Sequence, residues 1–373
     1  MSGTSLDGVD AVLCRIDGNS CEALQTHTHP FPEALKARVL AAIGQETTLQ
    51  EIGTIDHLLG KLYADAVKAL LQKSGMEAEK IEAIGSHGQT VWHEPTGATP
   101  FTMQLGDPNI ITAQTGIPVV ADFRRKDMAF GGNGAPFAPA FHQFLLGEQT
   151  RGVCVVNIGG IANITVLGDT LTGYDTGPGN MLMDLWISKH KGESYDKEGS
   201  WAREGRVDYT LLEAMMSDDY FAMPYPKSTG REKFNEAWLQ SVQRLALSTQ
   251  KKEKALHSNA YQNSSLFTLH SSLNPVDIQR TLLELTAQTV ANEVLKFNPD
   301  MLLLCGGGAR NGFLVERIAV LMPNVEVGVM EEADSLEAMM MAWLAYKRMH
   351  NETVVLKDVT GATTNTILGG VYR

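Results

Sequence analysis

The sequence has little of what several classes of protein require. Its four cysteines, Cys14, Cys21, Cys154 and Cys305, lack the spacing of a metal site and are expected to be reduced. There is no basic stripe, and a formal net charge of −12 argues against nucleic acid as a partner. No apolar run is longer than a strand, so no membrane span is predicted. The first residues are neither basic nor apolar, so we predict no signal peptide and expect a cytoplasmic location.

The composition is that of a globular protein. Hydrophobic residues make up 43% and charged residues 20% of the chain, and 373 residues are more than one core usually holds, so two domains are expected. Predicted strands alternate with predicted helices in two successive stretches, which indicates an α/β fold in each half. The boundary is predicted near residues 122–134, so that domain I comprises residues 1–125 and 349–373 and domain II residues 126–348. A polar, aperiodic stretch at about residues 248–272 is predicted to be a surface insertion.

Three glycine-rich turns stand next to predicted strands. Residues 2–10 (Ser-Gly-Thr-Ser-Leu-Asp-Gly-Val-Asp) enter a strand, and residues 157–163 (Asn-Ile-Gly-Gly-Ile-Ala-Asn) join two strands. Residues 306–311 (Gly-Gly-Gly-Ala-Arg-Asn) lie between a strand and a helix. Small residues let backbone N–H groups approach an anion, and hydroxyl groups add donors. One such turn alone is more often an ordinary hairpin, but three of them favour phosphate binding.

Well-known nucleotide and metal motifs are absent from the sequence. No Gly-x-x-x-x-Gly-Lys-Ser/Thr segment exists, which excludes a P-loop. The glycines at 306 and 308 are followed at the third place by Asn311 instead of glycine, so the dinucleotide fingerprint is broken. His93 and Glu94 are followed by Gly97 where a zinc protease needs histidine.

Three other segments follow predicted strands or precede a predicted helix and carry polar side chains. Residues 86–93 (Ser-His-Gly-Gln-Thr-Val-Trp-His) are predicted to be a loop that places polar groups beside an aromatic ring, as a sugar site would. Residues 122–125 (Asp-Phe-Arg-Arg) form a second predicted loop and supply a local cation. Residues 174–180 (Tyr-Asp-Thr-Gly-Pro-Gly-Asn) are predicted to be a tight turn at a helix start, in which Asp175 is the best candidate for a base. Each segment alone is more often a cap or a turn than a catalytic element.

Taken together, these segments occur in the order found in a known family. Met-Ser-Gly-Thr-Ser-Leu-Asp-Gly-Val-Asp, Ser-His-Gly-Gln-Thr, Ala-Asp-Phe-Arg and Asn-Ile-Gly-Gly-Ile-Ala-Asn are followed by Tyr-Asp-Thr-Gly-Pro-Gly-Asn, Cys-Gly-Gly-Gly-Ala-Arg-Asn and Leu-Glu-Ala-Met-Met-Met-Ala-Trp-Leu-Ala. The sequence resembles the 1,6-anhydro-N-acetylmuramic acid kinases, bacterial enzymes of cell-wall recycling. The resemblance covers nearly the whole chain except residues 248–272. Members of the family usually carry a short first strand before Met-Ser-Gly-Thr-Ser, so we expect that strand to lie ahead of the given sequence or the hairpin to be shortened.

The resemblance implies two actin-like (ribonuclease H-like) α/β domains with an ATP cleft between them, and a homodimer. The three glycine turns would then hold ATP as the first phosphate loop, the second phosphate loop and the adenosine site. The implied nucleotide-binding residues are Gly3, Thr4, Ser5, Leu6, Asp7, Gly8, Val9, Asp10, Asn157, Gly159, Gly160, Gly306, Gly307, Gly308 and Asn311.

The resemblance also implies a reaction in which anhydro-N-acetylmuramic acid, ATP and water give N-acetylmuramic acid 6-phosphate and ADP. Asp175 would deprotonate the water, and Glu337 on the last predicted helix is a possible second carboxylate, although an ordinary surface position on that helix is an equal alternative. Asp7 is the candidate ligand of Mg²⁺. The sugar site would contain Arg124, which would bind the lactyl carboxylate, together with His87, Gln89 and Asp122.

Two alternatives remain open at this point. One is an actin-like nucleotide-binding module without sugar chemistry, which explains the glycine turns but not His87, Arg124 and Asp175. The other is an oxidoreductase that binds a dinucleotide at residues 306–308, which Asn311 disfavours.

Overall fold

The chain folds into two compact α/β units. The structure is a computed structural model that describes all residues except 4–5, 148–151, 169–170, 259–273 and 331–334, with the backbone alone for 250–258. Unit 1 comprises residues 1–150, 169–171 and 334–373, and unit 2 comprises residues 151–168 and 172–333. The first boundary therefore lies later in the chain than the predicted region 122–134, and the return to unit 1 begins at 334, not at 349.

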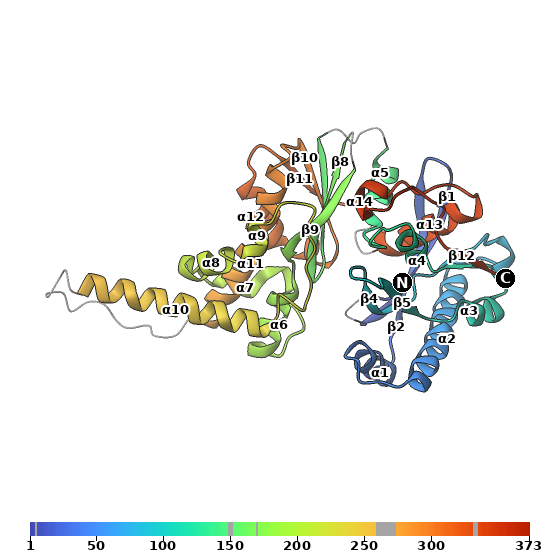
Figure 1. The fold of residues 1–373 in the computed structure, drawn as a ribbon, viewed down its shortest axis with the longest axis horizontal. Helices are drawn as coiled ribbons and strands as arrows, with labels where there is room; N and C mark the ends of the chain where they lie inside the picture. Colours follow the sequence, from blue (N-terminus) through green and yellow to red (C-terminus); the bar gives the residue numbers. More distant parts are fainter. Residues whose placement is uncertain (4–5, 148–151, 169–170, 259–273, 331–334) are drawn as a thin grey trace. The chain divides into compact units, whose positions relative to one another are not determined.

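Unit 1 contains short sheets covered by helices (Figure 1). Strands β1 and β2 form an antiparallel pair, β4 and β5 form a second pair, and the third sheet has the order β12-β6-β3. The elements of unit 1 are β1 (Gly8–Ile16), β2 (Cys21–Pro30), α1 (Glu33–Ile43), α2 (Leu49–Ser74), the 3-10 turn η1 (Ala78–Lys80), β3 (Ile84–Gly85), β4 (Gln89–Glu94), β5 (Phe101–Leu105), α3 (Pro108–Thr115), β6 (Val119–Ala121), α4 (Arg124–Ala129), α5 (Ala138–Leu146), α13 (Leu336–Met349), α14 (Lys357–Thr360) and β12 (Gly370–Tyr372).

Two helices of unit 1, α2 and α3, begin and end at residues with clear capping signals. The Thr48 side chain caps α2 by accepting a hydrogen bond from the Glu51 N–H, and Gly75 ends this helix in the left-handed conformation. Asp107 caps α3, Pro108 is its first residue and Gly116 ends it. Helix α2 buries one apolar stripe, which includes Ile55 and Leu59, in the core of the unit.

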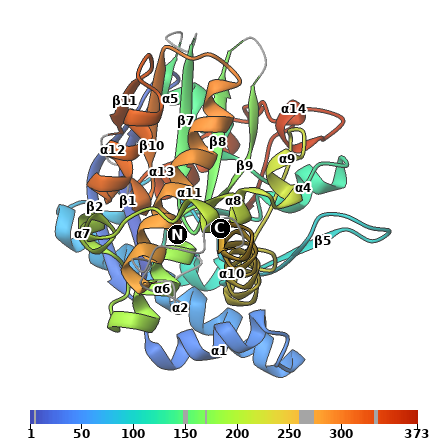
Figure 2. The same cartoon turned by 90° about the vertical axis from the view of Figure 1, so that its left-hand side faces the viewer.

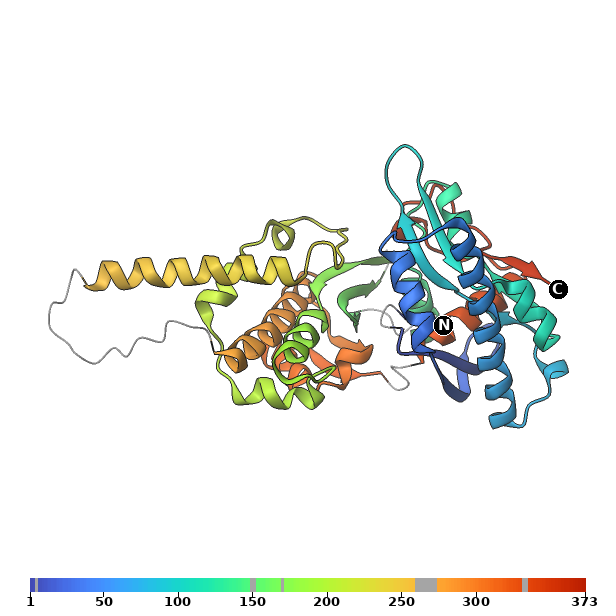
Figure 3. The same ribbon diagram turned by 90° about the horizontal axis from the view of Figure 1, so that it is seen from below.

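Unit 1 differs from the sequence prediction in three elements. Strand β2 was not predicted, and residues 89–93 of the predicted loop 86–93 belong to strand β4, which forms a hairpin with β5 that extends away from the rest of the unit (Figure 3, cyan). Helix α13 was assigned to domain II but belongs to unit 1, because it packs against β1, β3 and β6. A periodic apolar pattern predicts the helix but not the sheet that covers it.

Unit 2 is built on one five-stranded sheet with the order β11-β10-β7-β8-β9 (Figure 2). Strands β7, β8 and β9 run antiparallel in sequence, and β10 and β11 run parallel to β7. This arrangement is that of a ribonuclease H-like domain, so the predicted α/β class is confirmed here. The elements of the unit are β7 (Val153–Ile158), β8 (Ile161–Leu167), β9 (Thr172–Pro178), α6 (Met181–Lys191), η2 (Lys197–Gly199), α7 (Ser200–Glu204), α8 (Tyr209–Met216), α9 (Asp219–Ala222), α10 (Glu236–Ser258), α11 (Pro275–Leu295), β10 (Met301–Cys305), η3 (Gly307–Arg310), α12 (Gly312–Leu321) and β11 (Glu326–Val329).

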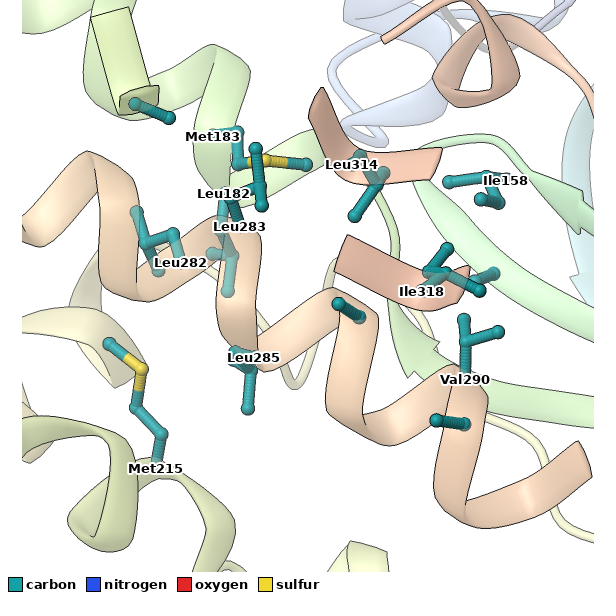
Figure 4. Packing of buried hydrophobic residues seen from close by; sticks show 14 of the residues in the cluster. Ile158, Leu182, Met183, Met215, Leu282, Leu283, Leu285, Val290, Leu314 and Ile318 are labelled. Atoms are coloured by element: carbon teal, nitrogen blue, oxygen red, sulfur yellow. The ribbon is translucent and has the colours of Figure 1, made fainter. Parts of the chain in front are cut away.

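The core of unit 2 forms around helix α11. Its apolar side chains, such as Leu283 and Val290, are fully buried between the sheet and the other helices, where Ile158, Leu314 and Ile318 also lie (Figure 4). A helix that is buried on nearly all sides needs partners for its polar side chains too. Helix α11 accordingly carries buried charged residues, Arg280, Glu284 and Glu293, each of which forms an ion pair.

The predicted surface insertion at about residues 248–272 lies only partly within the described residues. Residues 248–258 continue helix α10, and residues 259–273 lie outside the described residues. None of the helices in the described part of the chain combines the length and hydrophobicity that crossing a bilayer requires.

Candidate functional site

Two of the three predicted glycine turns meet at one end of the unit 2 sheet. Strands β7 and β10 are parallel neighbours in which Asn157 pairs with Cys305, so the turns that follow them lie side by side. A Cβ on Gly306 would stand 2.1 Å from the Asn157 Oδ1 atom, and one on Gly308 would stand 2.3 Å from the Ile158 Cγ2 atom. The structure therefore brings Asn157, Gly159 and Gly160 together with residues 306–308.

The end of β9 joins the same cluster of turns. The Gly179 and Asn180 N–H groups donate hydrogen bonds of 2.9 Å to the carbonyls of Gly160 and Gly159, and a Cβ on Gly179 would stand 2.2 Å from the Gly159 carbonyl oxygen. Helix α6 begins directly after these residues. Backbone N–H groups in glycine turns beside a helix N-terminus can bind phosphate. We refer to residues 157–160, 177–180 and 306–308 as the glycine cluster.

Asn311 has a role in the fold beside its predicted role in nucleotide binding. Its Oδ1 atom caps α12 by accepting a 3.0 Å hydrogen bond from the Leu314 N–H group, and it stands 2.4 Å from where a Cβ on Gly199 would lie. This oxygen therefore already accepts the hydrogen bond that caps α12. Contact between Asn311 and a nucleotide stays a prediction.

Asp175 lies in strand β9 and not in the predicted tight turn. The turn prediction was wrong because Thr172–Pro178, although rich in glycine, pairs with β8. Ser228 Oγ and the Thr229 N–H each donate a 3.0 Å hydrogen bond to Asp175 Oδ2, while the Asp175 N–H donates to the Lys227 carbonyl. Burial raises the pKa of Asp175, and the bonds from Thr229 and Ser228 oppose that rise. A carboxylate with a raised pKa is a stronger base than an exposed one.

The first glycine turn belongs to unit 1. Thr4 and Ser5 lie outside the described residues, Leu6 is buried with a φ of 53°, and its N–H donates to the Gly3 carbonyl. Gly8, Val9 and Asp10 already form the start of β1, where the Asp10 carboxylate accepts a 2.8 Å hydrogen bond from Thr28. The turn itself therefore ends at Asp7.

The Asp7 carboxylate is exposed and lies 3.0 Å from Lys36 Nζ. Within the described residues, no group of three or more His, Cys, Asp or Glu side chains could hold a metal ion. Protein Mg²⁺ sites in kinases commonly use one or two carboxylates together with substrate phosphates. A single carboxylate such as Asp7 fits that kind of site but not an all-protein cage.

In unit 1 the buried His87 forms a pair with the half-buried Arg124. Arg124 starts helix α4 and does not lie in a loop; its Nε and Nη2 atoms lie 3.1 and 2.8 Å from His87 Nε2, and its Nη1 donates to the Gly134 carbonyl. Burial, together with the charge of Arg124, lowers the pKa of His87 to about 3. Burial also lowers the pKa of Arg124 to about 10. His87 is therefore neutral and Arg124 charged at neutral pH.

The other predicted sugar-site residues are already engaged within unit 1. Gln89 is a buried residue of β4, and its Oε1 accepts a 2.6 Å hydrogen bond from Ser2. The carboxylate of Asp122 binds the guanidinium of Arg125, with both oxygens at 2.7 Å from its nitrogens. Neither residue contacts the His87–Arg124 pair through a described hydrogen bond.

Glu337 lies in the first turn of α13 in unit 1, whereas Asp175 belongs to unit 2. Glu337 is an exposed residue, as in the alternative that gave it an ordinary surface position on the helix. Neighbouring protein atoms nonetheless keep water from its carboxyl group, and this burial raises its pKa. Asp10 raises the pKa of Glu337 further and Arg124 lowers it, which places these two charges near Glu337. The structure thus gathers His87, Arg124, Asp10 and Glu337 in one part of unit 1.

Comparisons with known proteins decide the family. A family model described as anhydro-N-acetylmuramic acid kinase matches residues 1–373. A protein of that name from Sulfurovum sp. (strain NBC37-1) is 60% identical over 372 residues, which cover 100% of this chain and 97% of the relative. Another from Vibrio cholerae serotype O1 is 48% identical over 382 residues, covering 100% and 96%. The chain belongs to the anhydro-N-acetylmuramic acid kinase family.

Membership of the anhydro-N-acetylmuramic acid kinase family gives no support to the oxidoreductase or to the module without sugar chemistry. Among solved structures, a ROK family glucokinase from Streptomyces griseus in complex with glucose and AMPPNP is 14% identical, with a TM-score of 0.37, and the match covers 91% of this chain and 100% of that one. A likeness this distant supports no conclusion about individual residues.

The segment that binds Asp175 in this member of the anhydro-N-acetylmuramic acid kinase family was not predicted from the sequence. Residues 224–230 (Pro-Tyr-Pro-Lys-Ser-Thr-Gly) follow α9 and supply the Lys227 carbonyl, Ser228 Oγ and Thr229 N–H contacts. Two prolines and a Ser-Thr-Gly run predict an ordered turn. They do not indicate which residue, about fifty positions away, the turn will contact.

Proposed function

We propose that this protein catalyses the ATP-dependent ring opening and phosphorylation of 1,6-anhydro-N-acetylmuramic acid to N-acetylmuramic acid 6-phosphate, as part of peptidoglycan recycling. The family match over the whole chain supports this reaction. The structural observation that carries the proposal is the carboxylate of Asp175, which accepts hydrogen bonds from Ser228 and Thr229 and lies on a strand whose end joins the glycine cluster.

The substrate explains why a base is needed at this place. The 1,6-anhydro bridge leaves no free hydroxyl on carbon six, so an ordinary kinase nucleophile does not exist. In the proposed step, Asp175 takes a proton from water, the water oxygen bonds to the anomeric carbon, and the bond from that carbon to the bridging oxygen breaks. The released oxygen on carbon six then attacks the γ-phosphorus of ATP, and ADP leaves.

The nucleotide would bind through backbone N–H groups of the glycine cluster and of residues 3–10. Asp7 is the candidate protein ligand of Mg²⁺, which when bound would neutralise phosphate charge. The cleft expected between the two domains remains a prediction. We also retain the homodimer and the cytoplasmic location as proposals, and light scattering of the purified protein would test the first.

The sugar would bind through residues of unit 1. Arg124 keeps its charge beside a neutral His87, which suits the lactyl carboxylate of the substrate. His87, Gln89 and Asp122 would shape this site, and Gln89 and Asp122 would act through the contacts that they already make with Ser2 and Arg125. Glu337 is the candidate for assistance near Arg124.

The replacement Asp175→Asn tests the proposed base. Asparagine keeps the size of the side chain but has no carboxylate to accept the water proton. Because a general base contributes about 10² to 10⁴ in rate, turnover of the anhydro-sugar should fall at least to the upper end of that range, while ATP affinity changes less than severalfold. ADP release with the anhydro-sugar, compared with N-acetylmuramic acid itself, gives the measurement.

The control is Asp208→Asn, because Asp208 caps α8 in the same unit and asparagine caps a helix equally well. This variant should turn over the sugar normally. If Asp175→Asn kept more than about a tenth of the wild-type turnover, another group would be the base. Equal phosphorylation of the open and the anhydro sugar would contradict the coupled reaction itself.

A further inference from the structure

Unit 2 contains a lysine whose side chain is completely buried. The side chain of Lys227 is 0% exposed, and its Nζ lies 2.7 Å from Glu293 Oε1 and donates to the carbonyls of Tyr220 at 3.2 Å and Phe221 at 3.4 Å. The three acceptors match the three ammonium hydrogens. Burial of such a pair is weak evidence for stability, since apolar residues of similar volume often stabilise a protein as well or better. Stability alone therefore does not explain why this ion pair is present.

The position of Lys227 in the chain gives that explanation. The carbonyl of this residue accepts the 3.0 Å hydrogen bond from the Asp175 N–H, and the next two residues, Ser228 and Thr229, donate to the Asp175 carboxylate. Residues 222–226 before it and Ser228 after it are exposed. Lys227 is thus the buried point of an otherwise exposed segment that holds the proposed base.

Glu293 links this segment to the core and to the strand of Asp175. It lies on α11, and burial alone would raise its pKa, but hydrogen bonds from Lys227 and Lys296 outweigh burial and lower the pKa. Glu293 also accepts a 3.0 Å hydrogen bond from the hydroxyl of Tyr174, the residue before Asp175. One carboxylate on a core helix therefore fixes both the strand and the segment between which the Asp175 side chain is held.

We propose that the Lys227–Glu293 ion pair is a positioning device that holds residues 227–229 against Asp175 and so aims its carboxylate. This inference rests on the proposed role of Asp175 as base. Lys227 does not touch the reacting atoms, because its ammonium group is directed to Glu293 and to two backbone carbonyls. It acts through Ser228 and Thr229.

The variant Lys227→Met keeps the length of the side chain and removes the ammonium group. A displacement of about 1 Å in a catalytic group can cost about 10²-fold in rate, so kcat should fall about 10- to 100-fold. The KM for the anhydro-sugar and the affinity for ATP should change less than about 3-fold, because no ligand contact is removed. Glu293 keeps Lys296 and Tyr174 as partners, which favours a folded variant.

Lys296→Met is the matched control. Lys296 is the other cation on Glu293, but its side chain is 39% exposed and belongs to no part of the 227–229 segment. This variant should keep kcat within about 3-fold of the wild-type value. If Lys227→Met does not fold, as its melting curve would show, Glu293→Gln replaces it, since glutamine keeps the shape and loses the charge; its kcat is expected to fall in the same way.

Combining Lys227→Met with Ser228→Ala distinguishes a positioning role of Lys227 from a general loss of structure. If Lys227 acts through Ser228, Ser228→Ala should lower kcat in the wild-type background and have little further effect in the Lys227→Met background. Additive losses, a kcat for Lys227→Met within about 3-fold of wild type, or an equal loss in Lys296→Met would each overturn the proposal. Asp175→Asn is measured alongside: if it stays active, the proposed base is wrong, whereas an inactive Asp175→Asn with an unaffected Lys227→Met refutes the positioning role alone.

Discussion

Arg124 is a local cation in an acidic protein, and it keeps its charge although burial lowers its pKa. Its guanidinium is packed against a histidine that burial keeps neutral, against a carbonyl, and over the ring of Phe137 at 5.4 Å. None of these three neighbours carries a negative charge. In a chain of net charge −12, such a local cation favours an anionic ligand that long-range attraction would not bring.

The variant Arg124→Lys should therefore raise the KM for the anhydro-sugar more than that for ATP. Lysine keeps the charge but cannot make the forked contact of a guanidinium with a carboxylate. Since a hydrogen bond to a charged group contributes about 1.5–3 kcal/mol, an increase of about 10-fold or more is expected. Steady-state kinetics with each substrate varied in turn measures both constants. Arg15→Lys, at an exposed ion pair of unit 1, is the control, and an equal rise of both constants would assign Arg124 to the nucleotide or to the fold.

At the scale of elements, the sequence predicted what depends on neighbouring residues. Capped helices such as α3, the β7–β8 hairpin and the alternation of β10, α12 and β11 all follow from local pattern. Strand β2 escaped prediction because its exposed and half-buried residues alternate without an apolar face. Strand β9 escaped because two glycines and a proline are typical of turns, and only pairing with β8 makes this segment a strand.

In the candidate site, too, the sequence predicted only what depends on neighbouring residues. The glycine turns were found because each lies beside its own strand, and the parallel pairing of β7 and β10 then brought two of them together. The contact between Asp175 and residues 227–229 could not be predicted, since it depends on a buried ion pair between Lys227 and helix α11. Sequence pattern indicates Asp175 as the candidate carboxylate, and tertiary structure supplies the residues that hold it.

Two adjacent glycines of the glycine cluster should respond differently to alanine. Gly306 has a φ of 78° and a ψ of 175°, which is essentially a glycine-only conformation, and its Cβ would clash with Asn157. Gly306→Ala should therefore cost about 1–3 kcal/mol of stability. Gly307 has room, because the nearest atom to its Cβ would be Asn180 Nδ2 at 3.8 Å.

Gly307→Ala should accordingly melt like the wild type but bind ATP at least several-fold more weakly, because the added methyl group occupies the space proposed for adenosine. Thermal unfolding and calorimetric titration with ATP measure the two properties in each variant. Normal ATP binding by Gly307→Ala would place the adenosine elsewhere, and normal stability of Gly306→Ala would show that the strain is relieved.

At the scale of the whole molecule, each unit has its own hydrophobic core, and the chain leaves unit 1 and returns to it. Both units also contain ionisable groups whose pKa is shifted by burial. In unit 1 burial lowers the pKa of His87 and of His142, the latter to about 4. In unit 2 burial, and then Asp196, raise the pKa of Asp184 to about 7. Such groups make the stability of the folded chain depend on pH.

Asp184 gives the clearest test of this dependence. Its pKa is raised in the folded state above the unfolded value of 3.8, so the folded state binds the extra proton, and stability is lost as the pH rises from 3.8 through about 7. Asp184→Asn removes the titrating group. The stability of this variant relative to the wild type should therefore increase by about 1.4 kcal/mol for each pH unit between 5 and 7 and level off above 7. Denaturant unfolding at pH 5, 6, 7 and 8 measures the difference.

Asp65→Asn, at an exposed position of α2, should show no such trend. A pH-independent difference for Asp184→Asn would mean that this carboxyl group is ionised in the folded protein throughout, and that its position next to Asp196 is balanced by a cation or by water.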